Sequence, residues 1–180
     1  VEWEDVATGA GGGSDIVFAR STTNGANFAA EQIIDDPLGE VSSALDVSID
    51  VDPATASAAD DRVFLAWEDT REGSQVYFAR SLDAGATFAA ARRASSSGDL
   101  AVTGVTRDPA LAFVGGNTIL IGYTNDRLGV AHGYAAATID AGTSWHVTDP
   151  RLDTGAGQSV TPAVTRALNG GLVAWIDFRT

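Results

Sequence analysis

Two short motifs recur in phase along this chain, and their spacing constrains the fold more than any other feature. The first is an apolar run with an aromatic residue and a polar end; it reads VFLAWEDTR, ILIGYTNDR and GLVAWIDFR at 63–71, 119–127 and 171–179, with a truncated copy, VEWEDV, at 1–6. The second is an octapeptide that reads STTNGANF, SLDAGATF and TIDAGTSW at 21–28, 81–88 and 138–145. Two motifs that repeat together at intervals of about sixty residues indicate a series of similar supersecondary units.

Each unit contains segments with strand patterning, and none with a capped helical period. Apolar and aromatic residues alternate before the octapeptide, as in QVYFARS at 75–81. Another short apolar segment precedes the aromatic motif, as at 108–114, and Gly-Gly-Asn at 115–117 joins the two in a hairpin. With one further strand after the octapeptide, each unit has four short antiparallel strands. Units of this kind in series are typical of β-propeller blades, so the predicted fold is all-β.

The whole chain, 1–180, is predicted to be one propeller segment with about three four-stranded antiparallel blades. The predicted whole blades lie at approximately 41–95 and 105–152, and blade remnants lie at 1–35 and 158–180. Because propellers have about four to eight blades, three explanations stay open. The favoured explanation is that the chain is part of a longer parent; the alternatives are that it pairs with a second copy to complete a six-bladed ring, or that its exposed edges pair in a larger assembly.

The octapeptide has a composition that suits a tight turn between two strands. A turn needs partners for its backbone N–H groups, and the short carboxylates of Asp83 and Asp140 are suited to accept them. Gly85 and Gly142 tolerate the positive φ values that such turns require. We therefore expect these aspartates to hold the turns in shape rather than to act in catalysis.

The octapeptides at 81–88 and 138–145 resemble the Asp-box, or BNR repeat, of bacterial sialidases and their relatives. The first copy departs from that pattern, with Thr23 in place of Asp and Asn27 in place of Thr. The resemblance covers the whole chain and implies a sialidase-like β-propeller, with each box at the blade periphery and away from the active site. It implies a structural role for Ser21, Gly25, Phe28, Ser81, Asp83, Gly85, Thr87, Phe88, Thr138, Asp140, Gly142, Ser144 and Trp145.

The resemblance also bears on activity. Sialidases of this family use an arginine triad, a tyrosine nucleophile paired with a glutamate, and an aspartate acid/base, and this chain has none of them in a recognisable motif. The favoured interpretation is a non-catalytic Asp-box module of a secreted or cell-surface bacterial protein, with a binding or structural role and a glycan as ligand. Two alternatives stay open: part of a sialidase-type glycoside hydrolase (exo-α-sialidase), or a subunit of an extracellular fibre or coat.

The polar ends of the aromatic strands are the candidates for ligand binding. An arginine offers a planar fork of donors to a carboxylate, and a neighbouring carboxylate or amide orients it. The alternative interpretation is a brace within the fold, because the pair recurs in every unit whereas catalytic groups need differently tuned environments at one place. These candidates are Asp69, Arg71, Asn125, Arg127, Asp177 and Arg179.

The charge balance excludes some partners. The net charge is −13, with 11 basic and 24 acidic residues, so a nucleic-acid backbone would be repelled. No apolar run approaches the length of a membrane span, so membrane insertion is not expected. No cofactor is expected, with calcium as the one exception considered, because carboxylate oxygens are its ligands. The calcium candidates are Asp50, Asp52, Asp60 and Asp61, near Asp46.

Overall fold

A computed structural model describes residues 2–6, 13–35, 42–53, 57–95 and 104–179 of the chain. Within these residues the regular structure is almost entirely antiparallel strand, with one short 3-10 turn, η1, at Ala58–Asp60. The expectation of an all-β chain built from antiparallel sheets is therefore confirmed. The part of the chain that the structure describes holds no helix that is long and apolar enough to cross a membrane.

The strands form four sheets in chain order, each a simple meander. The first sheet contains β1 (Glu2–Val6), β2 (Ser14–Phe18) and β3 (Gln32–Ile33). The second contains β4 (Ala44–Asp52), β5 (Arg62–Asp69), β6 (Gln75–Ser81) and β7 (Arg92–Arg93). The third contains β8 (Thr106–Gly115), β9 (Thr118–Asn125) and β10 (His132–Thr138), and the fourth contains β11 (Gln158–Ala167) and β12 (Gly170–Phe178).

A short extended segment completes the outer edge of the third sheet. Tyr134 in β10 forms an antiparallel bridge with Arg151. On either side of this bridge, the Ala135 amide donates to the Pro150 carbonyl and the Leu152 amide donates to the Gly133 carbonyl. The third sheet thus has a partner at the position that β7 occupies in the second sheet.

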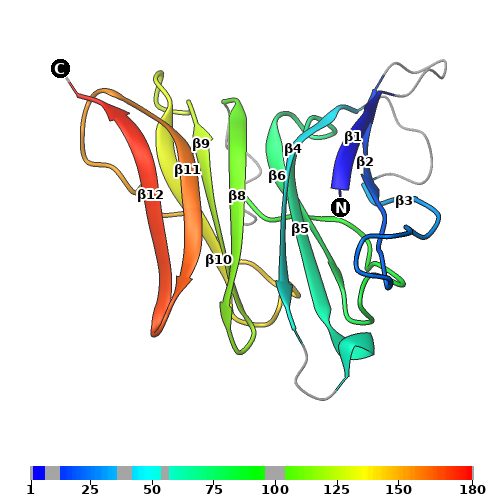
Figure 1. The fold of residues 1–180 in the computed structure, drawn as a ribbon. Coiled ribbons are helices and arrows are strands. Elements are labelled where there is room, and N and C mark those ends of the chain that lie inside the picture. Colours follow the sequence, from blue (N-terminus) through cyan, green and yellow to red (C-terminus); the bar gives the residue numbers. More distant parts are fainter. Residues whose placement is uncertain (1, 7–12, 36–41, 54–56, 96–103, 180) are drawn as a thin grey trace.

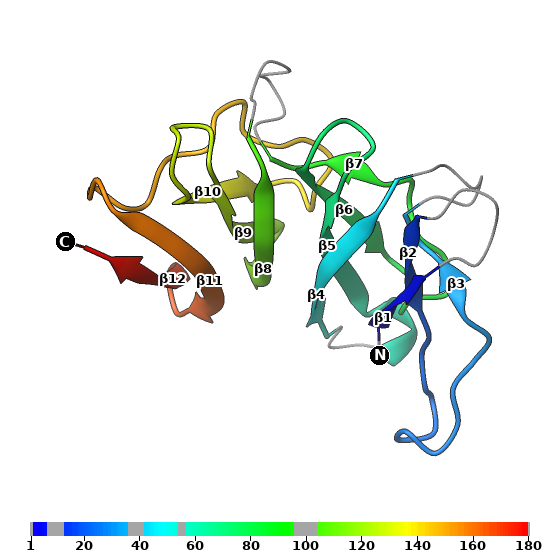
Figure 2. The same ribbon diagram turned by 90° about the horizontal axis from the view of Figure 1, so that it is seen from above.

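The four sheets fan out around a common concave side. Figure 2 shows β4, β8 and β11, the first strands of the second, third and fourth sheets, along this side. The aromatic-motif strands β5, β9 and β12 lie next to them, and all three run toward the same end of the molecule, which is the upper end in Figure 1. Homologous positions of the repeat therefore come to lie side by side at this end.

The hydrophobic core lies between successive sheets. Because side chains alternate along a strand, β5 contributes Phe64 to a cluster with the third sheet and Leu65 to a cluster with the first. Both residues are fully buried, as is Trp67. This burial on two faces explains why the motif is a continuous apolar run rather than an alternating one.

The first strand of the second, third and fourth sheets carries a β-bulge that the sequence did not reveal. The register shifts between Leu45 and Ser48 in β4, and again at the equivalent places in β8 and β11. Each shift contains one non-glycine residue in the left-handed region: Asp46, Asp108 and Thr161, with φ of 52°, 53° and 48°. A bulge bends its strand and re-aims side chains, so these polar residues leave the regular ladder at the shared upper end.

The three octapeptides form the same turn. The hydroxyl oxygens of Ser21, Ser81 and Thr138 accept a hydrogen bond from the amide of the glycine four residues later, at 2.9, 2.8 and 3.2 Å. These glycines have φ of 82°, 78° and 81°, so the expectation of positive φ is correct. The residue before each glycine is also left-handed: Asn24, Ala84 and Ala141.

Substitution of Ala84 by asparagine should stabilise the protein by about 0.5–1 kcal/mol, because asparagine tolerates the left-handed region better than alanine does. Asn24 occupies the same position in the first turn. Urea unfolding of the variant measures the change. The control is Ala90→Asn, at an exposed position without positive φ. Equal effects of the two changes would refute this account.

Candidate functional site

The Asp69–Arg71 pair at the end of β5 makes several contacts within the fold. Asp69 is fully buried, and its carboxylate accepts hydrogen bonds from the Trp67 indole at 3.0 Å and from the Arg71 amide at 2.9 Å. The Arg71 guanidinium forms an ion pair with this carboxylate and stacks on the Tyr77 ring at 4.4 Å. It also donates to the Asp35 carbonyl of the first sheet, so it joins two sheets.

The Asn125–Arg127 pair at the end of β9 repeats this arrangement with a neutral acceptor. The Asn125 side-chain oxygen accepts from both the amide and the Nε of Arg127, each at 2.9 Å. The guanidinium stacks on the Tyr134 ring at 3.8 Å and donates to the Tyr123 hydroxyl. These contacts favour the interpretation of both arginines as braces within the fold.

The Asp177–Arg179 pair of the fourth sheet is much more open. Arg179 Nε donates to the Asp177 carboxylate at 2.9 Å, but the arginine side chain is 68% exposed. The three pairs therefore share one end of the molecule while each is built within its own sheet. By comparison, the side chain of Arg71 is 19% exposed.

A further carboxylate, that of Glu68, lies at this end, and no sequence motif indicated it. Glu68, next to Asp69, is buried and accepts a hydrogen bond from the Ser74 hydroxyl at 2.8 Å. Burial raises the pKa of Glu68, and the charges of Asp46 and Asp108 at the bulges add to this effect, whereas Ser74 and Arg107 oppose it. The bulges of two sheets and the end of β5 thus place several charged groups in one neighbourhood, which no local motif announces.

Another repeated feature lies at the outer edge of the first three sheets. Three side chains there accept a hydrogen bond from a backbone amide of β2, β6 or β10. Asp35 accepts from Ile16 at 2.8 Å, Ser95 from Val76 at 3.0 Å, and Asp153 from Gly133 at 3.1 Å. In the sequence these positions appear only as a short polar residue after an apolar one. In the third sheet the buried Asp153 also pairs with buried His132 and with Arg151.

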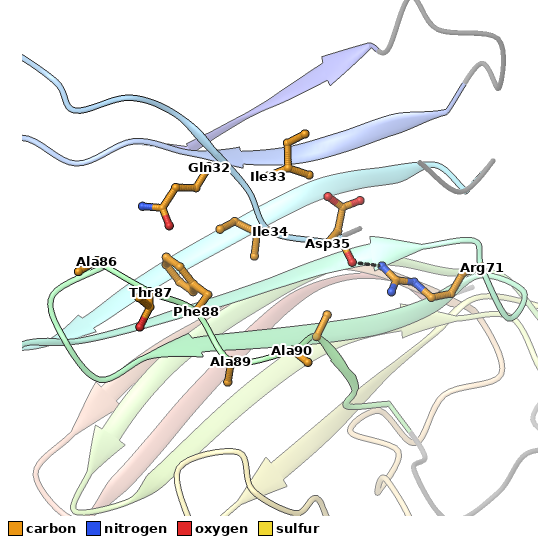
Figure 3. A pocket seen from close by; sticks show the side chains of 11 residues that line it. Gln32, Ile33, Ile34, Asp35, Arg71, Ala86, Thr87, Phe88, Ala89 and Ala90 are labelled. Carbon is orange, nitrogen blue, oxygen red and sulfur yellow. Dashed lines mark hydrogen bonds between the residues drawn. The ribbon is translucent and has the colours of Figure 1, made fainter. Parts of the chain in front are cut away.

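Asp35 and Arg71 form the polar end of a cavity of about 440 Å³ between the first and second sheets. Figure 3 shows Ile33 and Ile34 on one wall and Phe88 on the other, with the Arg71 guanidinium bonded to the Asp35 carbonyl. Burial raises the pKa of Asp35 to about 6. Gln32 and Thr87 line the cavity away from Asp35 and Arg71, so its lining mixes apolar and polar side chains.

The aspartates of the second and third octapeptides serve their own turns. Asp83 accepts from the Thr87 hydroxyl and amide and from the Ser81 hydroxyl, and these hydrogen bonds lower the pKa of Asp83 to about 2. Asp140 accepts equivalent bonds from Ser144 and Thr138, and they hold the pKa of Asp140 well below its usual range. In the first turn the Thr23 hydroxyl takes the place of the carboxylate and accepts from the Asn27 amide at 2.9 Å.

The calcium candidates lie toward the opposite, hairpin end of the second sheet. Asp52 forms an ion pair with Arg62, and Asp50 accepts from the Phe113 amide at 2.8 Å. Asp60 and Asp61 lie in and after η1. The described residues contain no group of three or more histidine, aspartate or glutamate side chains arranged to hold a metal ion. Calcium binding by these aspartates stays a prediction.

Solved structures of glycan-cleaving enzymes share this fold. A Hadza microbial sialidase matches 92% of this chain and 38% of its own, with a TM-score of 0.60 and 16% identity. An α-L-arabinanase of Penicillium chrysogenum complexed with arabinobiose matches 99% and 58%, with a TM-score of 0.60 and 12% identity. A mutant NanB sialidase of Streptococcus pneumoniae matches 84% and 21%, with a TM-score of 0.53 and 13% identity. No family model and no curated protein matches the sequence.

These matches support a sialidase-like β-propeller fold, which agrees with the resemblance seen in the sequence. At such low identities the likeness concerns the fold alone. The chain spans less than two thirds of the length of each of these structures.

The opposite pKa shifts of Asp35 and Asp83 predict opposite effects of pH. A raised carboxyl pKa contributes stability that is full below the ordinary value of 3.8 and is lost as pH rises through about 6. Asp35→Asn should therefore gain stability relative to the unaltered protein between pH 4 and pH 7. A lowered pKa contributes stability that is lost as pH falls, so the deficit of Asp83→Asn should shrink between pH 4 and pH 2. Urea unfolding at each pH measures both trends; a pH-independent difference for either variant would contradict its assignment.

Proposed function

We propose that this chain is a non-catalytic Asp-box segment of a β-propeller that binds a glycan, in a secreted or cell-surface bacterial protein. The observation that carries this proposal is the shared fold with a sialidase and an arabinanase, whose names describe action on glycans. The shared turn geometry of the three octapeptides supports the Asp-box assignment. The proposed blades follow the sheets, with whole blades at 41–95 and 105–152 and partial blades at 1–35 and 158–180.

The proposed binding surface is the upper end of the molecule in Figure 1, where the aromatic-motif strands end. Arg179 and Arg107 are exposed there and offer donors to a carboxylate or to sugar hydroxyls. In this proposal Arg71 and Arg127 stabilise the fold next to the binding surface and do not contact the ligand, because ring stacking and hydrogen bonds already engage their guanidinium groups.

Calorimetric titration of the chain with sialyl-oligosaccharide and with arabino-oligosaccharide tests this proposal. Arg179→Gln should weaken binding about tenfold, in line with the loss of a charge-assisted hydrogen bond. The matched control is Arg166→Gln, an exposed arginine in β11 near the opposite hairpin end. Equal loss in both variants, or no binding of either sugar, would refute the proposed surface.

The alternative of a sialidase-type glycoside hydrolase has one specific observation in its favour. Sialidases of the family that the octapeptides resemble use an acid/base carboxyl group beside a tyrosine nucleophile, and a carboxyl group with a raised pKa suits the acid/base role. Glu68 has a raised pKa close to the charges of Asp46 and Asp108. Turnover of a fluorogenic sialoside by the longest form of the protein, lost in Glu68→Gln, would favour the enzyme; an inert protein would leave the binding role.

The partners proposed with this function are a glycan and either further blades of a parent chain or a second copy of this chain. A solution mass near 18.5 kDa for the folded chain would exclude the paired ring. A fibre or coat subunit, the third role considered, would form ordered oligomers in electron micrographs and bind no glycan.

A further inference from the structure

The turn of the second sheet docks on two residues of the first sheet. Gly85 lies against the ring of Phe18, so closely that a Cβ at this position would be 2.6 Å from two ring carbons. Arg20, two residues after Phe18, donates to the Ala84 carbonyl at 3.1 Å. Phe88, the last residue of the octapeptide, meets the Phe18 ring edge-on at 4.9 Å.

The turn of the third sheet docks on the second sheet in the same way. Gly142 lies against the ring of Phe78, and Trp145 meets that ring edge-on at 5.1 Å. Arg80 donates to the Ala141 carbonyl at 2.6 Å. An aromatic residue and an arginine at i and i+2 lie on one face of a strand, which explains why both act on the same turn.

The last strand of the preceding sheet, β3 or β7, adds a further contact to each docked turn. Gln32 in β3 donates to the Gly85 carbonyl at 3.0 Å, and Arg92 in β7 donates to the Thr143 carbonyl at 3.0 Å. Each docked turn is thus held by a ring, a guanidinium and a side-chain donor of the preceding sheet. We call the aromatic residue and its arginine the Phe-x-Arg pair.

The first turn has the same shape but presents its docking face to solvent. Gly25 has φ of 82°, and in the described part of the chain no atom lies within 4 Å of a Cβ built on it. Phe28, which is equivalent to Phe88 and Trp145, is 49% exposed. Both Gly85 and Gly142 are buried by their docking partners.

The third sheet shows that the Phe-x-Arg pair is not needed for the strand itself. Strand β10 ends at Thr138, the equivalent of Ser81, so Ala135 and Ala137 occupy the places of Phe78 and Arg80. Both strands keep their antiparallel pairing with the aromatic-motif strand. In the described residues, the pair is therefore present in the two sheets on which a turn docks.

We propose that the exposed face of the turn at 21–28 is a docking surface for a β-strand that carries an aromatic residue and an arginine two positions later. Gly25 would receive the aromatic ring, the Asn24 carbonyl would accept from the guanidinium, and Phe28 would meet the ring edge-on. A second folded copy of this chain does not supply such a strand, because Phe18 and Phe78 are already covered by turns. The partner is a strand from outside residues 1–180.

Disulfide tethering tests the proposal, because the chain has no cysteine and Thr22→Cys places a single thiol on the exposed turn. Two peptides compete for this thiol: residues 75–81 with a Gly-Gly-Cys tail, and residues 132–138 with the same tail. The second peptide is the natural control, since alanines replace its aromatic residue and arginine. The first peptide should resist about tenfold more reductant than the second, as expected for one charge-assisted hydrogen bond and a ring contact.

Two further variants keep the result interpretable. Phe28→Ala leaves the turn backbone intact and removes the edge-on ring, so it should reduce the preference for the first peptide. Gly25→Val fills the ring site and should abolish it. Equal tethering of the two peptides by the Thr22→Cys protein would overturn the proposal.

Discussion

Replacement of Gly142 by alanine should lower the free energy of unfolding by about 2–5 kcal/mol. Two costs combine. Alanine disfavours the left-handed backbone by about 1–2 kcal/mol. The added methyl group also overpacks a site that has no free space, which costs about 1–3 kcal/mol. The added Cβ would lie 2.2 Å from a Phe78 ring carbon, and that ring is itself buried. Urea unfolding followed by tryptophan fluorescence measures the loss.

Gly25 provides the matched control for this effect. Its φ of 82° is almost equal to the 81° of Gly142, but a Cβ there meets no atom of the described residues within 4 Å. Gly25→Ala should therefore cost only the backbone term, about 1–2 kcal/mol. In a Phe78→Ala background, Gly142→Ala should fall toward the same value, because the clashing ring is gone. Equal losses for Gly25→Ala and Gly142→Ala would show that docking of the turn does not hold the sheets together.

Replacement of Asp69 by leucine should destabilise the protein by about 3–5 kcal/mol, the typical cost of removing one partner from a buried ion pair. The carboxylate is fully buried and serves both the Trp67 indole and the Arg71 guanidinium. Its loss leaves these donors without their acceptor. Thermal and urea unfolding measure the change.

Asparagine at the same position is the natural control. Asn125 performs this role in the third sheet, where its amide oxygen accepts twice from Arg127. Asp69→Asn keeps one acceptor oxygen, but its NH2 group faces a donor that the other carboxylate oxygen served, so it should cost less than Asp69→Leu but more than about 1 kcal/mol, the scale of a net hydrogen bond. If both variants bind glycan with unaltered affinity once folded, Asp69 is a brace. A loss of binding in folded Asp69→Asn would instead indicate a direct role.

Much of the fold was accessible from periodicity because each prediction rested on local geometry. Glycines such as Gly85 stand where only a left-handed backbone closes the turn, and the backbone there has the expected positive φ. The alternation in 75–81 predicted a strand, and β6 spans those residues. The continuous apolar run of β5 reflects contact on two faces, which the repeat itself implies.

The candidate site was less accessible because its properties depend on groups far apart in the chain. The repeated motif predicts Asp69 and Arg71 as ligand-binding residues, but it does not distinguish their neighbour Glu68. The pKa of Glu68 is raised by burial and by Asp46 and Asp108, which the bulges bring near it. A bulge has no strong sequence signature when its left-handed residue is aspartate or threonine rather than glycine.

The sequence alone determined the kind of unit, its order and its turns, since strand alternation and left-handed glycines are local consequences of backbone sterics. Only the tertiary structure decided what each repeated residue contacts. Gly85 and Gly142 each lie against an aromatic ring of the preceding sheet, whereas Gly25 has no such neighbour among the described residues, and Arg179 differs from Arg71 in its exposure. The physical reason is that packing and desolvation are sums over neighbours from other sheets, and identical residues acquire different environments when those neighbours differ.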